Sequence, residues 1–290
     1  MGETKVQLLR DRIIDEIFYA LGLKRTGLAR RLLGRLFYLP AVHFSQIAAR
    51  FDDEAALSGL PGACHRVLPD FSMTVTARGV ERIPAEGPLL VVCNHPGTFD
   101  SLALGSSIPR RDLKIFVSDV RFARALTSTS PYLFFVPADP AGRMTALRGA
   151  IDHLRSGGAA LIFAQGQVEP DPAFMPGASE AIETWSSSLE IMLRKAPHTR
   201  LQVAIASHAL LPRFRRSPIV RLRRKPYAQQ KLAEFIQAIQ QMVFPGSVRL
   251  NIRLSFAPPV CAAELATPMM PGIKGMGQRL LEEHQRVYLE

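Results

Sequence analysis

A histidine and an aspartate five positions apart are the residues of this chain best placed to do chemistry. His95 and Asp100 belong to the segment Asn-His-Pro-Gly-Thr-Phe-Asp, which begins directly after the apolar run Leu89 to Cys93. An imidazole can take a proton from a hydroxyl, and a carboxylate can fix its tautomer and stabilise the imidazolium. Pro96 and Gly97 predict a turn that lets the two side chains face each other. The spacing therefore predicts a general-base pair that activates a hydroxyl supplied by a substrate.

The same spacing also fits an ordinary loop histidine followed by an aspartate that caps a helix. The position of the pair favours chemistry, because functional groups in open α/β sheets collect beyond the carboxyl ends of the strands. Residues 89–93 are apolar at every position, which is typical of a strand buried on both faces.

The elements around this pair alternate between strand-like and helix-like patterns. Short apolar runs predict strands, and apolar residues that recur every three or four positions predict helices. The expected strands cover 73–77, 89–93, 113–117, 134–136, 159–163, 201–206 and 248–256, and the clearest expected helices cover 143–154, 229–243 and 273–288. The alternation predicts an α/β fold with a central mixed, largely parallel sheet flanked by helices.

We expect an N-terminal amphipathic helical segment over 1–70, followed by the α/β domain with its C-terminal helices over 71–290. Within the first segment, a helix is expected over 27–39, and Pro40 is expected to end or kink it. Residues 52–70 are predicted to form a linker with a short helix. Basic residues on one face of the second helix fit an interfacial membrane helix or a helix packed on the core.

The charge of the chain indicates an anionic partner. Lys and Arg number 36 against 25 Asp and Glu, so the net charge is +11. A membrane surface, an acidic carrier protein, a phosphorylated cofactor and nucleic acid all fit this charge, as does a basic solvated surface. Nucleic acid is disfavoured because the basic residues lack interleaved aromatics. Residues 213–225 hold seven basic residues and no acid, which suits anionic headgroups, a carrier protein or phosphates.

Other classes of protein and site are disfavoured by missing patterns. The sequence has no apolar run near the length of about 20 residues that spans a bilayer and no signal-peptide pattern. We therefore expect a cytoplasmic protein that is peripheral on the inner membrane face. Neither a Gly-x-Ser-x-Gly elbow nor a Gly-x4-Gly-Lys loop is present, which disfavours serine hydrolases and P-loop enzymes. No metal-ligand spacing occurs, so no metal site is expected.

The segment Asn-His-x4-Asp after an apolar strand resembles the first motif of the glycerol-3-phosphate and lysophosphatidate acyltransferases. The resemblance extends over roughly Val75 to His208. Its lead-in is 79–84, and 134–137 followed by Arg143 resembles the family's second motif. Residues 163–167, which read Phe-Ala-Gln-Gly-Gln, resemble the third motif, Phe-Pro-Glu-Gly-Thr.

The resemblance implies an acyltransferase that moves a fatty acyl group from acyl-CoA or acyl carrier protein to a hydroxyl of a lyso-phospholipid or related lipid precursor. It implies catalysis by His95 and Asp100, no bound cofactor, and an anionic membrane surface as a partner. Backbone N–H groups near Gly97 or Gly166 are the expected donors to the oxyanion. The substrate-binding positions that we carry over are Asn94, Gly97, Arg143, Gln165, Gly166 and Gln167.

The third motif departs from the family pattern. Gln165 replaces the family's Glu, and Gln167 replaces its Thr. An amide donates and accepts hydrogen bonds but carries no charge, so the identity of the acceptor is left open. Glu169 and Asp171 are alternative carboxylates nearby. The departure also motivates an alternative function, a non-catalytic lipid-binding protein at a membrane surface that retains the acyltransferase fold.

Overall fold

The computed structural model describes residues 2–20, 28–224, 226–244 and 246–289. The strands of this part of the chain are β1 (Met73–Arg78), β2 (Leu89–Cys93), β3 (Lys114–Ser118), β4 (Leu133–Val136), β5 (Ala159–Phe163), β6 (Arg200–Ser207), β7 (Leu250–Phe256) and β8 (Val260–Cys261). Its α-helices are α1 (Gly2–Ala20), α2 (Leu28–Val67), α3 (Asp100–Ser107), α4 (Arg121–Arg124), α5 (Pro140–Arg155), α6 (Ala178–Glu183), α7 (Ser188–Lys195), α8 (Pro212–Arg215), α9 (Pro218–Arg221), α10 (Pro226–Val243) and α11 (Met269–Tyr288).

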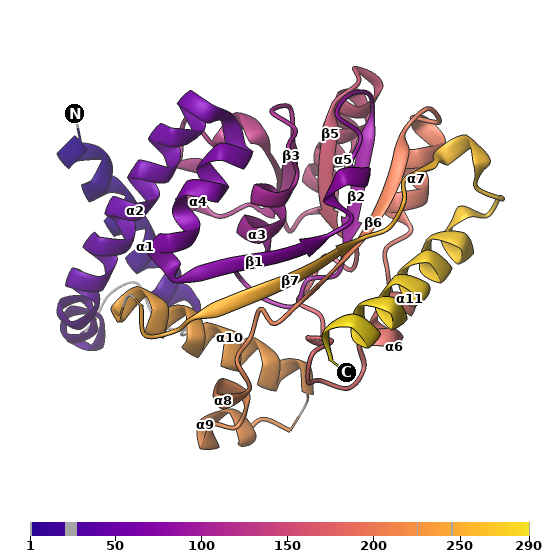
Figure 1. The fold of residues 1–290 in the computed structure, drawn as a ribbon. Coiled ribbons are helices and arrows are strands. Elements are labelled where there is room, and N and C mark those ends of the chain that lie inside the picture. The colour runs from indigo at the N-terminus through magenta and orange to yellow at the C-terminus, as the bar shows by residue number, and fades with distance from the viewer. Residues whose placement is uncertain (1, 21–27, 225, 245, 290) are drawn as a thin grey trace.

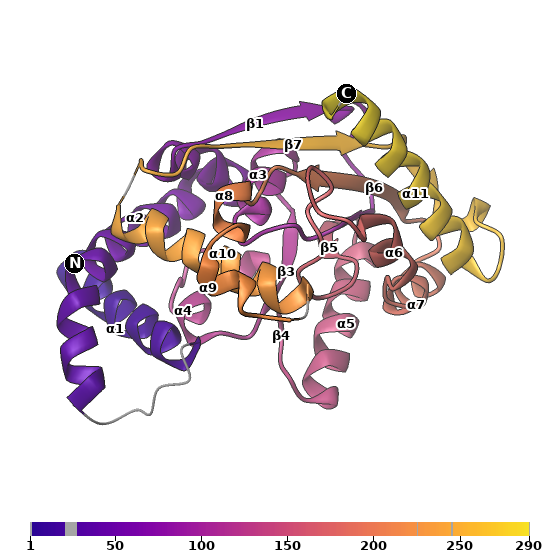
Figure 2. The same ribbon diagram turned by 90° about the horizontal axis from the view of Figure 1, so that it is seen from below.

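One mixed sheet joins these strands in the order β1-β7-β6-β2-β5-β3-β4, and β8 pairs with β6. The five strands from β6 to β4 are parallel, β7 runs antiparallel to β6, and β1 is parallel to β7. Helices cover the sheet, with α1 to α4 toward one side and α5, α6, α7 and α11 toward the other (Figures 1 and 2). The predicted α/β fold, with a largely parallel central sheet and an N-terminal helical segment, is confirmed.

The strand that leads to the candidate pair, β2, lies between two hydrophobic clusters. Leu89, Val91 and Cys93 face the cluster that includes α2 and α3. Leu90 and Val92 face the cluster that includes α5, α7 and α11. All five side chains are fully buried. Burial on both faces explains why this strand is apolar at every position, and it makes β2 a rigid support for the loop that follows.

The helix α2 differs from the prediction for the N-terminal segment. It continues through Pro40 until Gly59, whose φ of 73° and ψ of 178° break the helical conformation, and Pro61 lies at the start of the second helical stretch. The predicted helix end at 39 and the predicted linker over 52–70 are therefore wrong. An interior proline costs a helix about 3 kcal/mol, and burial of the inner face of α2 against its neighbours offsets that cost. The buried apolar residues on this face are Ala41, Ile47, Ala48, Ala49, Ala55, Leu60, Ala63, Cys64 and Val67.

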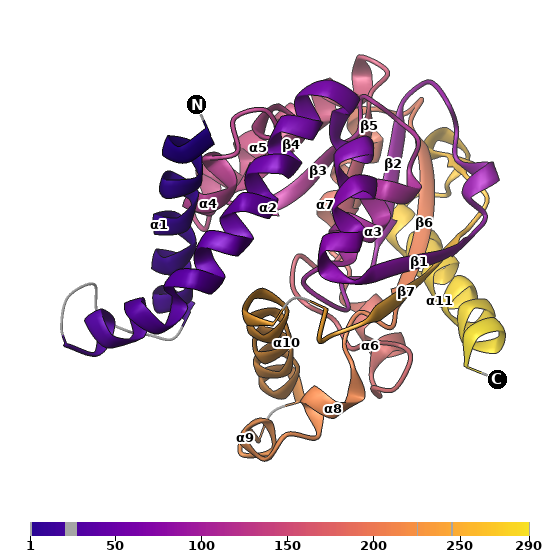
Figure 3. The ribbon, with the colours of Figure 1, turned by 60° about the vertical axis from the view of Figure 1, so that its left-hand side comes forward.

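The two N-terminal helices lie side by side (Figure 3). A buried acid, Asp52, bonds them to the rest of the chain. Lys5 of α1 pairs with Asp52 and Asp53 of α2, each at 2.7 Å. Asp52 also accepts the backbone N–H groups of Ser128 at 3.0 Å and Thr129 at 2.8 Å. The N-terminal helices are thus bonded to the loop before β4. Among the described residues, no helix is both long and apolar enough to cross a bilayer.

Candidate active site

The predicted pair meets at the carboxyl end of β2. The Nδ1 atom of His95 lies 2.8 Å from Oδ2 of Asp100, and the N–H of Gly97 donates to the same oxygen over 3.2 Å. Asp100 opens α3 and is fully buried, whereas the His95 side chain is 23% exposed. The imidazole stacks on Phe163 with ring centroids 4.1 Å apart. The carboxylate and the Phe163 ring therefore hold the imidazole, and within the described residues its Nε2 has no hydrogen-bond partner.

The charges around His95 favour its role as a base. Burial lowers the pKa of His95, but the charge and hydrogen bond of Asp100 and the charge of Glu169 raise it above its ordinary value. An imidazole with a raised pKa binds a proton more strongly, so it removes one more readily from a hydroxyl. The buried carboxylate at Nδ1 also stabilises the imidazolium that results.

The loop that carries His95 is held against the end of β6. A Cβ on Gly97 would lie 2.7 Å from Cβ of Ala209, so the close approach of the two chains requires glycine. The Asn94 amide donates to the carbonyl of Ala206 over 3.0 Å and accepts its N–H over 2.8 Å. Asn94 is 3% exposed, so its side chain positions the loop, and its predicted contact with a substrate stays a prediction.

The residues that resemble the third motif follow β5, beside the catalytic pair. The Gln165 side chain donates to Oγ1 of Thr184 over 2.6 Å. Gly166 has a φ of 72°, a left-handed conformation that favours glycine, and the position that a Cβ would occupy is open. Gln167 is exposed, and its side chain forms no hydrogen bond in the described part of the chain. This turn therefore presents neutral polar groups, and their predicted contacts with an acceptor stay predictions.

The two backbone donors expected for an oxyanion are already used. The N–H of Gly97 donates to Asp100, and the N–H of Gly166 donates to the carbonyl of Phe163 over 3.0 Å. Each backbone N–H is a single donor, and here each closes a turn of its own loop. An oxyanion would therefore be bound by neighbouring N–H groups of these turns, and the expectation of backbone donors near Gly97 or Gly166 stays a prediction.

Arg143, which the resemblance places in the second motif, follows a strand that is not adjacent to β2 in the sheet. Arg143 is exposed in the first turn of α5, which follows β4. The strands β5 and β3 separate β4 from β2, a distance of about 14 Å at the usual spacing of neighbouring strands. Its predicted contact with an acceptor phosphate stays a prediction.

Two acids that the sequence marks only as nearby carboxylates are built into the site. Glu169 is 1% exposed, its N–H donates to the carbonyl of His95 over 2.7 Å, and its Oε2 accepts from Nε1 of Trp185 over 3.3 Å. Burial raises the pKa of Glu169 to about 7. Burial also raises the pKa of Asp171 to about 6, although this carboxylate accepts backbone N–H groups from Ala173, His208, Ala209 and Leu210. These acids join the loops after β2, β5 and β6.

The helix α10 contributes polar groups that the sequence interpretation missed. Four of its polar side chains are buried, namely Gln230, Glu234, Gln237 and Gln241. Their spacing of four, three and four residues places them on one face of the helix. That spacing is visible in the sequence, but polar residues on one helix face ordinarily predict a solvated surface.

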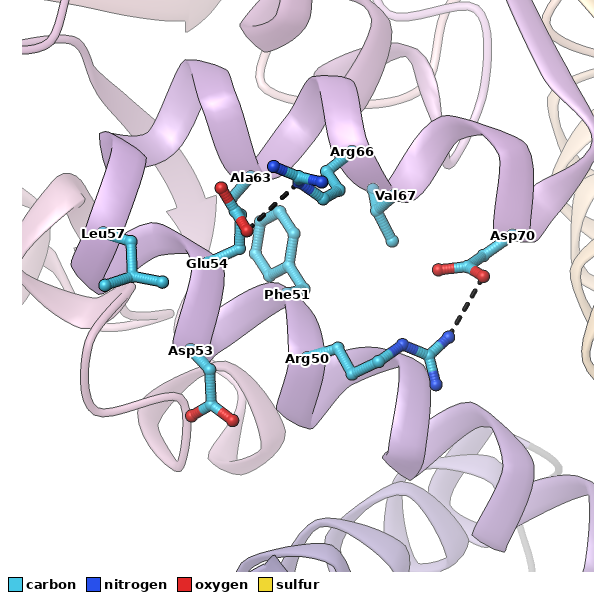
Figure 4. A pocket seen from close by; sticks show the side chains of 9 residues that line it. All are labelled: Arg50, Phe51, Asp53, Glu54, Leu57, Ala63, Arg66, Val67 and Asp70. Atoms are coloured by element: carbon cyan, nitrogen blue, oxygen red, sulfur yellow. Dashed lines mark hydrogen bonds and ion pairs between the residues drawn. The ribbon is translucent and has the colours of Figure 1, made fainter.

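A separate pocket lies along α2, at the break near Gly59 (Figure 4). Two ion pairs line it, Arg50 with Asp70 at 3.0 Å and Arg66 with Glu54 at 3.1 Å. None of the residues of the loops after β2 and β5 lines this pocket. It is therefore distinct from the site around His95.

Residues 74–197 match the model of the family described as Acyltransferase. This chain carries an acyltransferase domain. The matched residues run from β1 to the end of α7 and include both His95 and the third-motif turn. A crystal structure of the 1-acyl-sn-glycerophosphate (LPA) acyltransferase PlsC from Thermotoga maritima is similar, with a TM-score of 0.51 and 13% sequence identity. The similarity covers 98% of this chain and 97% of that one.

The comparisons confirm the predicted resemblance and the predicted class of enzyme, an O-acyltransferase. The similarity in fold includes the N-terminal helices and the elements after α7, because it extends over nearly the whole of both chains. No curated protein matches the sequence. The roles of the site residues therefore rest on their geometry in this chain.

Proposed function

We propose that this acyltransferase moves a fatty acyl group from acyl-CoA or acyl carrier protein to a hydroxyl of a lyso-phospholipid or related lipid precursor. The observation that carries the proposal is the 2.8 Å contact between His95 and the buried Asp100, with Nε2 of the imidazole left without a protein partner among the described residues. The acceptor class is supported by the similar fold of the lysophosphatidate acyltransferase from Thermotoga maritima.

In the proposed reaction, Nε2 of His95 takes the proton of the acceptor hydroxyl while the hydroxyl oxygen attacks the thioester carbonyl carbon. Asp100 at Nδ1 keeps the tautomer whose Nε2 is free and stabilises the imidazolium. The tetrahedral intermediate then breaks its carbon–sulfur bond, and the imidazolium returns the proton to the departing sulfur. One ester and one thiol result, so the thioester is a co-substrate and atoms and charges balance without a bound cofactor.

The acceptor side of the site is proposed to recognise its ligand through neutral groups. Gln165 stands where the family has a carboxylate, and it hydrogen-bonds to Thr184. The turn at Gly166 and Gln167 is exposed beside Phe163, on which His95 stacks. An amide recognises hydroxyl groups as donor or acceptor without attracting a cation, which suits the polar part of a lipid headgroup.

An anionic membrane surface is the proposed partner, on the cytoplasmic face of the membrane. The chain has no acidic residue between Glu190 and Glu234, and α8 and α9 lie within that stretch, packed on α10 (Figure 3). Ile219 and Leu222 are 61% and 81% exposed. Exposed arginines lie near them in the sequence, namely Arg213, Arg216, Arg221, Arg223 and Arg224. Apolar side chains among cations suit an interface with anionic headgroups.

Release of free thiol tests the reaction. The protein is mixed with an acyl thioester and a panel of lyso-lipids, and the thiol is quantified together with the mass of the acylated product. We expect release by the wild type and its loss in His95→Ala. His198→Ala is the matched control, because His198 is exposed and its side chain makes no hydrogen bond in the described part of the chain. If neither wild type nor His95→Ala releases thiol while both bind vesicles equally, the alternative of a non-catalytic lipid-binding protein is favoured.

Vesicle binding tests the partner. We expect the wild type to bind phosphatidylcholine vesicles that contain phosphatidylglycerol and to lose that binding at high salt. The double variant Arg221→Glu with Arg224→Glu should bind them weakly, whereas Arg194→Glu with Lys195→Glu on α7 should bind as the wild type does. Equal binding by both double variants would exclude the α8–α9 surface. If the double variant Arg221→Glu with Arg224→Glu still binds vesicles but no longer uses acyl carrier protein as a donor, the α8–α9 surface binds the carrier protein instead.

A further inference from the structure

The buried face of α10 is polar instead of apolar. Gln230, Glu234, Gln237 and Gln241 lie on one face of the helix and are 1%, 5%, 3% and 4% exposed. A helix that packs on a domain usually buries an apolar stripe, and burial of polar groups is costly unless they form hydrogen bonds. The burial of these four polar side chains therefore requires an explanation from their contacts.

Two glutamines of this face bind backbone atoms of three separate loops. The Gln230 side chain donates to the carbonyl of Pro96, over 3.4 Å, and to that of Glu169. The Gln237 side chain donates to the carbonyl of Ala209 over 2.8 Å and accepts the N–H of Leu211 over 2.9 Å. One helix thus contacts the loop after β2 that carries His95, the loop after β5 and the loop after β6.

The same three loops are bonded to one another beneath α10. The N–H of Glu169 donates to His95, and Asp171 accepts the N–H of Ala209 over 2.9 Å. The Cα of Gly97 packs against Ala209 so closely that a Cβ would not fit. The catalytic pair therefore sits on a set of loops whose relative placement depends on a few hydrogen bonds, and α10 supplies bonds to each of them.

Between the two glutamines, Glu234 fills the space as a neutral acid. Burial and the charges of Asp100 and Asp171 raise the pKa of Glu234 to about 9, while a hydrogen bond with Gln230 opposes this shift. In the described part of the chain its Oε1 has no hydrogen-bond partner. A protonated carboxyl at this position adds no negative charge near Asp100.

We infer that α10 is the positioning element of the acyltransferase site, and that Gln230 and Gln237 are positioning residues that hold the loops after β2, β5 and β6 in register around His95 and Asp100. The side-chain amides are suited to this task because each donates, and Gln237 also accepts, without bringing charge to the site. The inference rests on the proposed function for its kinetic readout alone.

Substitution by methionine, which has a similar length and no amide, separates the hydrogen bonds from the packing. In Gln230→Met and Gln237→Met we expect the pKa of His95, followed by the NMR shift of its imidazole, to fall toward the ordinary value of 6.5 as contact with Asp100 loosens. A displacement of the pair should lower kcat by about 100-fold with little change in KM. Gln240→Met is the matched control on the same helix, because the amide of Gln240 donates to Oγ of Ser247, over 3.3 Å, and that contact lies outside the three loops.

The two readouts keep this inference separate from the proposed reaction. If the wild type releases no thiol, the proposed function fails, but the pKa of His95 still reports whether α10 positions the pair. If both methionine variants melt cooperatively and keep the pKa of His95 and the kcat of the wild type, α10 is a structural cover and the inference is overturned. If one methionine variant does not fold, the other one gives the same two readouts.

Discussion

The loop after β2 and the loop after β5 lie together at the site, yet their buried acids differ in whether they have an ionisable partner. In the first loop, Asp100 is fully buried and paired with His95 at 2.8 Å. In the second, Glu169 and Asp171 are equally buried but form no ion pair among the described residues, and burial raises their pKa values to about 7 and about 6. The buried acid of the first loop has an imidazole as its partner, whereas desolvation disfavours the charged form of the two acids in the second loop.

This difference separates the loop to which we assign the chemistry from the loop that is proposed to face the acceptor. The first loop keeps every residue of the family's first motif, and its geometry is that of a base and its orienting acid. The second loop has lost the carboxylate of the third motif at Gln165, and the nearest acid is the buried Glu169. We therefore expect that substitutions in the loop after β2 abolish activity, whereas some substitutions in the loop after β5 retain it.

Removal of the charge in the first loop should have the largest effect. In Asp100→Asn, the amide leaves the imidazolium without a counter-charge and allows the wrong tautomer, so kcat should fall by about 10⁴-fold. The pKa of His95 should fall with it, because Asp100 is the main cause that raises it. Thiol release and NMR titration measure the two effects. Asp139→Asn is the control, because Asn also caps the start of α5, and a loss below tenfold in Asp100→Asn would contradict the proposed pair.

A steric change in the same loop should have the next largest effect. In Gly97→Ala, the new Cβ would meet Ala209 at 2.7 Å, so the loop should shift and kcat should fall by about 100-fold. The strain should also cost about 1–3 kcal/mol of unfolding free energy. Ala209→Gly in the same chain removes the opposing methyl group and should restore most of both losses. Failure of this rescue would show that contact between the loops after β2 and β6 does not set the position of the pair.

Replacement of the buried acid of α10, Glu234, should change stability more than activity. The folded pKa of Glu234, about 9, exceeds the unfolded value of 4.5. The folded state therefore holds a proton that the unfolded state releases between these values. The contribution of this proton is complete below pH 4.5, falls at about 1.4 kcal/mol per pH unit, and is lost above pH 9.

Glu234→Gln should remove this dependence, because the amide resembles the neutral acid and does not ionise. Urea unfolding at pH 7 and pH 8 should show that the wild type loses about 1.3 kcal/mol of stability relative to Glu234→Gln over that step. Equal slopes for the two proteins would show that Glu234 is ionised in the folded state.

The smallest effect is expected in the second loop. Glu169 contributes less than Asp100 to the raised pKa of His95, so Glu169→Gln should lower that pKa by less than Asp100→Asn does. Its kcat should change by less than about tenfold. Glu180→Gln, at an exposed acid of α6, is the control for a general loss of negative charge. A larger effect for Glu169→Gln than for Asp100→Asn would reverse the roles that we assign to the two loops.

The strands and the catalytic pair were predictable because their signals are local. The apolar run of β2 reflects burial on both faces, and the Pro-Gly turn brings His95 and Asp100 together within six residues. The end of the second helix was not predictable, because the cost of Pro40 is local but the packing of α2 that offsets it involves distant elements. The use of the Gly97 and Gly166 N–H groups inside their own turns was also decided by the folded loops.

The sequence by itself determined the fold class, the family resemblance and the meeting of His95 with Asp100, since each depends on residues that are close along the chain. The tertiary structure alone decided that a polar face of α10 would hold three loops, and that Glu169 and Glu234 would be buried beside the pair. The physical reason is desolvation. The same glutamine or glutamate is an ordinary surface residue in water and a positioning or neutral group once other elements exclude water from it.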